Sequence, residues 1–111
     1  MTTLNFAAPY ERWLRDGSKT TTLRLGHRLE PRAGEIVEVT VDDPDGVPKS
    51  VGRARVVQVK YLSLGALTEE DLHGESPDCR SVESAGRVLR AIYDRELDPD
   101  EALTLIRFQP L

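Results

Sequence analysis

Three side chains with potential for chemistry lie close together in the segment Gly17–Leu25 (GSKTTTLRL): Lys19, Thr22 and Arg24. An ammonium, a hydroxyl and a guanidinium that converge on one pocket are suited to bind a small polar or anionic group. The Gly-Ser pair that begins the segment favours a turn, which would swing Lys19 toward the side of Thr22 and Arg24. We therefore take this segment as the candidate functional centre.

The segment itself is predicted to be a strand. Threonine is β-branched and favours extended backbone, and three threonines are followed here by a Leu-Arg-Leu run. Alternation along a strand places Leu23 and Leu25 on one face, which suits a core. The same alternation places Thr20, Thr22 and Arg24 on the opposite face, where they would meet a ligand.

The charge distribution favours a small ligand over a long polyanion. The chain has a net charge of -4, and the first 32 residues carry +3 while the remainder carries -7. An acidic body argues against a domain that binds nucleic acid mainly through its phosphates. A basic site on such a body suits a small polar or anionic ligand, or one nucleotide.

Length and composition indicate one globular domain over residues 1–111, with 39% hydrophobic and 31% charged residues. No apolar run approaches the ~20 residues of a membrane helix, and the N-terminus lacks the features of a signal peptide, so we expect a cytoplasmic protein without membrane contact. The single cysteine, Cys79, offers neither an internal disulfide nor a zinc site, and we interpret it as a small structural side chain.

Hydrophobic periodicity and turn residues predict seven elements. In chain order they are a helix over 9–16, a strand at 20–25, strands over 35–41 and 53–62, a short helix over 68–74, a longer helix over 81–95 and a strand over 102–108. Trp13 is expected to anchor the first helix in the core, and His27 to lie in a solvated loop. This order predicts an α+β fold in which a mostly antiparallel sheet, flanked by helices, curls into a small open β-barrel.

The residues Gly17, Lys19 and Arg24 match the signature G-x-K-x-x-x-x-R of the ASCH domain, a β-barrel superfamily related to the PUA RNA-binding fold. The segments 32–39 and 67–75, the helix that ends at Ile92-Tyr93 and the final strand 103–108 follow in the order typical of that family, so the resemblance spans nearly the whole chain. It implies a single PUA-like ASCH domain.

Within that superfamily, the chain most resembles small bacterial amidohydrolases that remove the acetyl group from N(4)-acetylcytidine. The resemblance implies Lys19, Thr22 and Glu75 as catalytic residues, with Arg24 and Thr20 binding the substrate. It implies a nucleoside substrate, no cofactor and no metal. The chain departs from the family at Thr21, where an aliphatic residue is usual, and in the loops 42–50 and 95–101, which bear on substrate preference.

The residue types suit cleavage of an amide. Thr22 could attack the carbonyl if a base removes its proton, and Lys19 could be that base only when neutral, which burial and the like charge of Arg24 would favour. Glu75 could hold the cytosine amine or protonate it. Two alternatives stay open: Arg24 could bind the acyl oxygen or a phosphate, and Glu75 could pair with Lys19, which would oppose the base role.

A second hypothesis is an RNA-binding or RNA-processing ASCH module without amidohydrolase activity, which the kinship with the PUA fold and the basic N-terminal third suggest. It predicts a continuous basic groove with an exposed aromatic side chain for base stacking. Aromatic residues make up only 5% of the chain, and Tyr10 and Trp13 are expected on the apolar face of the first helix. The composition therefore favours the amidohydrolase.

Overall fold

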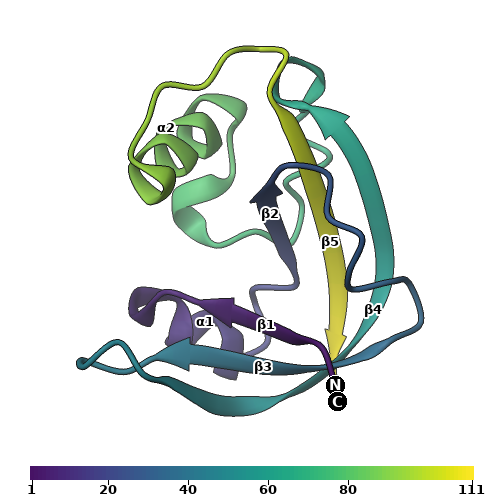
Figure 1. The fold of residues 1–111 in the computed structure, drawn as a ribbon, viewed down its shortest axis with the longest axis vertical. Coiled ribbons are helices and arrows are strands. Elements are labelled where there is room, and N and C mark those ends of the chain that lie inside the picture. The colour runs from purple at the N-terminus through teal and green to yellow at the C-terminus, as the bar shows by residue number, and fades with distance from the viewer.

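The framework of the fold is one mixed five-stranded sheet, and the computed structural model describes all residues from 1 to 111. Its spatial order is β1-β3-β4-β5-β2, with β1 and β3 parallel and the other pairs antiparallel (Figure 1). The strands are β1 (Thr3–Phe6), β2 (Thr21–Leu25), β3 (Ile36–Asp42), β4 (Pro48–Ser63) and β5 (Ala102–Pro110). β2 therefore lies at one edge of the sheet and β1 at the other.

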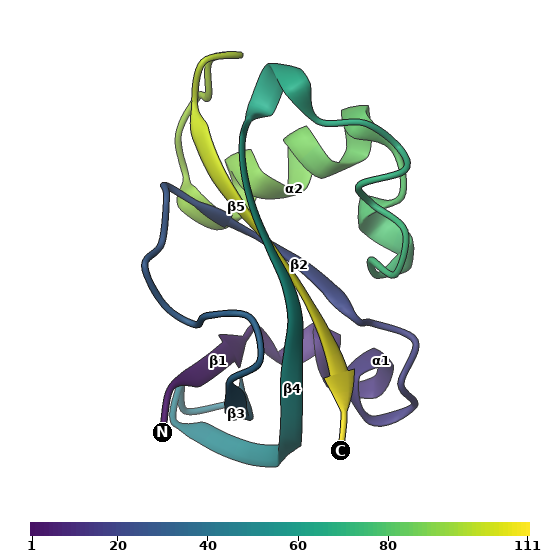
Figure 2. The same cartoon turned by 90° about the vertical axis from the view of Figure 1, so that its right-hand side faces the viewer.

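The long strand β4 explains how five strands enclose a site. Its first part pairs with β3 and its second part pairs with β5, and a register shift interrupts each ladder. Bulges of this kind increase local twist and bend a strand. Gly52, with φ of +144°, lies at the irregularity opposite Val39 and supplies a backbone conformation that other residues rarely adopt. The sheet consequently curls into a half-barrel (Figures 1 and 2), which confirms the predicted α+β open barrel of mostly antiparallel strands with flanking helices.

The helices flank the open side of this half-barrel. The longest, α2 (Val82–Tyr93), begins with a capping box in which the Ser81 hydroxyl accepts a hydrogen bond from the Ser84 N–H, and it ends at Asp94 in a left-handed conformation. The others are short: α1 (Glu11–Arg15) and the 3₁₀ helices η1 (Ala8–Tyr10), η2 (Leu64–Ala66) and η3 (Pro77–Cys79). No helix is both long and apolar enough to cross a membrane.

Three expectations about local structure are wrong. β1 is absent from the predicted order, although it pairs with β3. The segment 68–74 forms turns instead of a helix, because the Asp71 carboxylate accepts hydrogen bonds from the Thr68 N–H and hydroxyl, a local arrangement that competes with helix formation. The core residue of α1 is Leu14, whereas Trp13 is only partly buried and packs against Tyr10.

The apolar interior consists of two clusters. The first lies under β1, β3 and the adjoining parts of β4 and β5, and its largest members are Phe6 and Phe108. The second lies between α2 and the other end of β5, and it includes Leu89, Leu103 and Leu105. The two clusters leave a hollow between them, and the candidate site lies in that hollow.

Candidate active site

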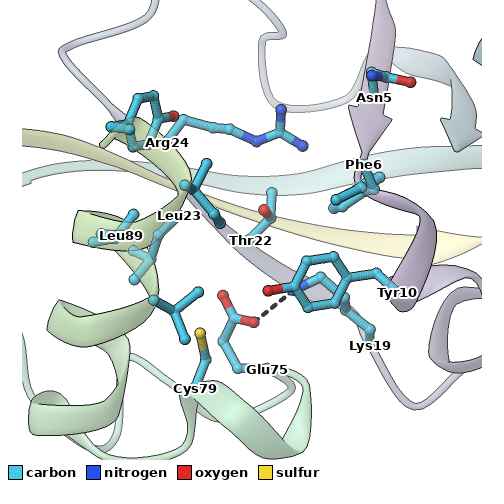
Figure 3. A pocket seen from close by; sticks show the side chains of 14 residues that line it. Asn5, Phe6, Tyr10, Lys19, Thr22, Leu23, Arg24, Glu75, Cys79 and Leu89 are labelled. Carbon is cyan, nitrogen blue, oxygen red and sulfur yellow. Dashed lines mark hydrogen bonds and ion pairs between the residues drawn. The ribbon is translucent and has the colours of Figure 1, made fainter. Parts of the chain in front are cut away.

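An open cavity of about 110 Å³ lies where β1, β2, η3 and α2 face one another (Figure 3). Nine of its 14 lining residues are hydrophobic. The charged lining residues are Lys19, Arg24 and Glu75. The other lining residues are Asn5, Phe6, Ala7, Tyr10, Thr22, Leu23, Cys79, Val88, Leu89, Ile92 and Tyr93. The predicted convergence of Lys19, Thr22 and Arg24 on one pocket is thus confirmed, and Glu75 joins them.

Lys19 and Glu75 form a buried ion pair in this cavity. The Lys19 Nζ lies 2.5 Å from Oε2 of Glu75, and the two side chains are 4% and 2% exposed. Lys19 also donates to the Thr21 carbonyl oxygen at 3.0 Å, and the Ser76 N–H donates to the same Oε2 at 3.1 Å. The second carboxylate oxygen, Oε1, has no hydrogen-bond partner in the chain and is free to meet a ligand. Of the two arrangements left open by the sequence, this is the one in which Glu75 pairs with Lys19.

The turn before β2 brings Lys19 to this position. Gly17 adopts a left-handed conformation with φ of +80°, and the Lys19 N–H then donates to the Trp13 carbonyl oxygen at 3.0 Å. This folds the chain back on α1 before the strand begins at Thr21. Lys19 therefore reaches the cavity from outside the regular alternation of β2.

Two aromatic rings from the N-terminal segment face the ammonium of Lys19. Its Nζ lies 5.0 Å from the ring centroid of Tyr10 and 5.7 Å from that of Phe6, within the range of cation–π attraction. The Tyr10 hydroxyl donates to Asp78 at 3.0 Å, which connects η1 to η3 across 68 residues of sequence. Burial and the charge of Asp78 raise the pKa of Tyr10 above its ordinary value, so its phenol stays protonated.

Arg24 differs from Lys19 because it has no partner. Its guanidinium carbon lies 4.8 Å from the ring centroid of Phe6, and its side chain forms no hydrogen bond or ion pair with the chain. Burial lowers the pKa of Arg24, although the ordinary value is so high that the group stays charged. The Thr22 hydroxyl, 5% exposed as a residue, likewise has no partner in the chain. Both polar groups are available to a bound molecule.

Thr20 does not lie where alternation predicts. It precedes the first residue of β2 and lines a separate shallow hollow with Glu69, His73 and Arg80. Its N–H donates to the Gly74 carbonyl oxygen at 2.8 Å, so the backbone is held against the loop before it enters the strand. The expectation that Thr20 shares the ligand-facing side of Thr22 is therefore wrong.

Arg107 on β5, which sequence reasoning missed, holds the loop that presents Glu75. Its guanidinium donates to the carbonyl oxygens of Glu70, Asp71 and His73 at 3.3, 3.1 and 2.8 Å. It also donates to the Thr21 hydroxyl at 3.0 Å, and that hydroxyl donates to the His73 carbonyl oxygen. Thr21 is thus one of the residues that hold this loop in place.

Cys79 forms part of the cavity wall beside Glu75. Burial, followed by the charges of Glu75 and Asp78, raises the pKa of its thiol to about 12, so the thiol is not activated as a nucleophile. His27 is exposed and lies outside the cavity, with its ring 5.2 Å from that of Tyr61. No group of three or more His, Cys, Asp or Glu side chains is arranged to hold a metal ion.

The fold is shared with several solved structures, while no family model matches the sequence. An ASCH domain from Lactobacillus crispatus superimposes with a TM-score of 0.76 at 18% identity, covering 98% of this chain and 78% of that one. A protein from Enterococcus faecalis gives 0.67 at 20% identity, covering 93% and 70%. A protein from Pyrococcus furiosus gives 0.64 at 19% identity, covering 99% and 96%. The chain therefore has the PUA-like fold of an ASCH domain.

One curated protein also matches part of the sequence. An imidazole-4-carboxamide isomerase from Methylobacterium nodulans is 34% identical over an alignment of 99 residues that covers 81% of this chain. The chain spans 38% of the length of that isomerase, so the match does not extend the isomerase's activity to it.

Proposed function

We propose that this ASCH-fold chain is an amidohydrolase that removes the acyl group from N(4)-acetylcytidine or related N(4)-acylated cytosine nucleosides. The observation that carries the proposal is the meeting of Lys19, Thr22 and Glu75 in one cavity (Figure 3). These are the three residues that the resemblance to N(4)-acetylcytidine amidohydrolases implies. They come from the turn before β2, from β2 itself and from the loop before η3, so their meeting depends on the fold.

The pairing of Glu75 with Lys19 opposes the base role of Lys19, so the proposed reaction begins with the transfer of a proton within the pair. Passage of the shared proton from Lys19 Nζ to Glu75 Oε2 produces a neutral amine and a protonated carboxyl group. The amine can then take the Thr22 proton while Thr22 Oγ1 attacks the amide carbonyl carbon. As the C–N bond breaks, the carboxyl proton passes to the departing cytosine amine. The pair is then again an ammonium and a carboxylate. Water hydrolyses the acyl-threonine ester: its oxygen joins the acyl carbon as the ester C–O bond breaks, one proton returns to Thr22 Oγ1, and the acyl group leaves as a carboxylic acid that loses its proton to solvent.

The remaining walls suit the rest of such a substrate. Phe6 and Tyr10 offer aromatic surfaces for a planar base, and Leu23, Val88 and Leu89 offer an apolar surface for an acyl chain. A lining that is mostly apolar with a few convergent polar groups is typical of small-molecule sites.

The direct test is the absorbance change as N(4)-acetylcytidine becomes cytidine. Single replacements Lys19→Ala, Thr22→Ala and Glu75→Ala should each reduce kcat/KM by at least about 100-fold, the scale of a lost acid, base or nucleophile. Thr20→Ala is the matched control, because it removes a neighbouring threonine that lies outside the cavity, and it should keep wild-type turnover. Circular dichroism must show that each variant is folded. Absence of turnover by the wild type on acetyl and longer-chain acylcytidines would refute the proposal.

The RNA-binding alternative has one observation in its favour. Tyr61 is 49% exposed, packs against His27 and donates its hydroxyl hydrogen to the Arg28 carbonyl oxygen, so an aromatic ring lies beside basic residues outside the cavity. A salt-dependent shift of labelled single-stranded RNA that disappears in Tyr61→Ala would support this function. Absence of a shift at low salt would exclude it.

A further inference from the structure

The cavity contains one more positive charge than negative charge. Only Lys19, Arg24 and Glu75 among its lining residues are charged, and Lys19 and Glu75 neutralise each other in their ion pair. The nearest charged neighbour on the following loop, Arg28, is exposed and adds a further positive charge. Arg24 is therefore the source of an uncompensated charge inside the site.

Arg24 and Arg107 differ in the hydrogen bonds that their side chains donate. Both side chains are partly buried, but Arg107 donates five hydrogen bonds to acceptors within the chain, whereas Arg24 donates none. Removal of a charge from water without a partner costs several kcal/mol in general. The ring of Phe6 covers one face of the Arg24 guanidinium and leaves its N–H edge unused. An acceptor from outside the chain would complete this arrangement.

The position of Arg24 indicates what kind of acceptor it meets. Figure 3 shows Arg24 and Glu75 on opposite sides of Thr22, with the guanidinium extending toward Phe6 and Asn5. If Glu75 faces the departing amine, as the proposed function has it, Arg24 faces a part of the ligand beyond the reacting carbonyl. A planar guanidinium matches the two oxygens of a carboxylate or a phosphate by paired hydrogen bonds.

We propose that the cavity selects ligands that carry a permanent anionic oxygen group, a carboxylate or a phosphate, and that Arg24 binds this group. The inference rests on the cavity being the substrate site of the proposed function. It adds a substrate class: acylated nucleosides that carry a negative charge, either on the acyl chain or on the sugar.

The first experiment tests the anion site without any nucleoside. Acetate, inorganic phosphate and neutral acetamide are titrated at constant ionic strength while the Arg24 Nε–H resonance is followed by NMR. Acetate or phosphate should shift this resonance saturably and with at least about 10-fold higher affinity than acetamide, the ratio expected for a charge-assisted hydrogen bond. Equal affinity for acetate, phosphate and acetamide would overturn the inference.

Three variants keep this experiment decisive. Arg24→Gln removes the charge at similar length and should abolish specific anion binding, which is then followed by changes in backbone amide resonances around the cavity. Arg28→Gln is the matched control, because it removes a neighbouring charge outside the cavity and should leave anion affinity within about 2-fold. If Arg24→Gln proves unfolded, Arg24→Lys takes its place in the experiment. It keeps the charge and should retain part of the anion affinity. Unchanged anion binding by folded Arg24→Gln would contradict the assignment.

The second experiment identifies where the charge lies on the ligand. The succinyl derivative of cytidine, with a terminal carboxylate, is compared with its neutral terminal amide as a substrate, and cytidine 5′-monophosphate is compared with cytidine as a bound product. A preference of at least about 10-fold for the charged member of one pair, lost in Arg24→Gln, assigns that group to Arg24. Hydrolysis without charge preference would refute the anion site and leave the proposed function standing. Anion binding at Arg24 without hydrolysis of any acylcytidine would refute the proposed function and leave the anion site standing.

Discussion

Removal of one charge from the Lys19–Glu75 pair should destabilise the whole protein. Both side chains are almost completely buried, at 4% and 2% exposure, so Glu75→Gln leaves an ammonium in the interior without its counter-charge. Loss of one partner from a buried pair typically costs about 3–5 kcal/mol, which is a large share of the 5–15 kcal/mol that stabilises an ordinary domain. For a chain of this size the melting temperature should fall by roughly 10–20 °C.

The double variant Lys19→Met/Glu75→Gln separates the value of the pair from the cost of an unpaired charge. Because it buries neither charge, it should be more stable than Glu75→Gln alone, although it has lost more of the native interactions. Urea unfolding at pH 7, followed by fluorescence of the only tryptophan, Trp13, measures all three proteins.

A surface ion pair supplies the control for this comparison. Lys49 pairs with Glu11 at 3.1 Å while 49% of its side chain is exposed, and Lys49→Met should cost no more than about 1 kcal/mol. A cost for Glu75→Gln as small as that of Lys49→Met would refute the reasoning. So would a double variant that is no more stable than Glu75→Gln alone.

Further predictions concern the loop before η3 and the cavity wall. Arg107→Met should lower the free energy of unfolding by about 2 kcal/mol in urea titrations, because it leaves several backbone carbonyl groups without their charged donor, and Arg107→Lys should restore only part of this loss. Although burial acts to raise it, hydrogen bonds from Lys60 and Thr68 lower the pKa of Asp71. The stability that Asp71 contributes is therefore present above the ordinary carboxyl pKa of about 3.9 and is lost as pH falls through the lower folded value. Asp71→Asn should therefore lose less stability than the wild type as the pH falls from about 5 to about 2, the range in which carboxyl groups take up protons. Urea unfolding at several pH values measures this difference. An unchanged dependence of stability on pH would contradict the role of this carboxylate. Since the pKa of Cys79 is raised to about 12, its thiol should react with iodoacetamide at pH 8 far more slowly in the native protein than in urea, and equal rates would show that it is not buried.

Local patterns predicted the parts of the fold whose cause is local. The alternation in β3 and the serine cap of α2 are properties of neighbouring residues, and both elements form as expected. β1 has only four residues, and it is a strand because β3 offers it a parallel edge far along the chain. The expected helix over 68–74 failed for the opposite reason, since one carboxylate there satisfies the local backbone and hydroxyl donors in a turn.

The residues of the candidate site likewise differ in whether the sequence could predict them. Lys19, Thr22 and Arg24 are visible in the sequence because they share one short segment, and Glu75 was found only through the resemblance to a family. Phe6, which contacts two of the cationic groups, carried no local signal. A ring that faces a cation from another element is a tertiary contact, and nothing in its own neighbourhood marks it.

The two apolar clusters of the interior supply different walls of the cavity. Phe6 belongs to one cluster and Leu89 to the other, yet both line the cavity. The strands β4 and β5 run through both halves, and their backbone ladder fixes the separation of the walls (Figure 2). The frame that spaces the walls is therefore distinct from the side chains that line them. Exposed residues at the rim of the cavity, such as Ile92, can therefore be replaced by larger or smaller ones without opening a void in either apolar cluster. Such replacements would change the shape of the ligand that the cavity accepts.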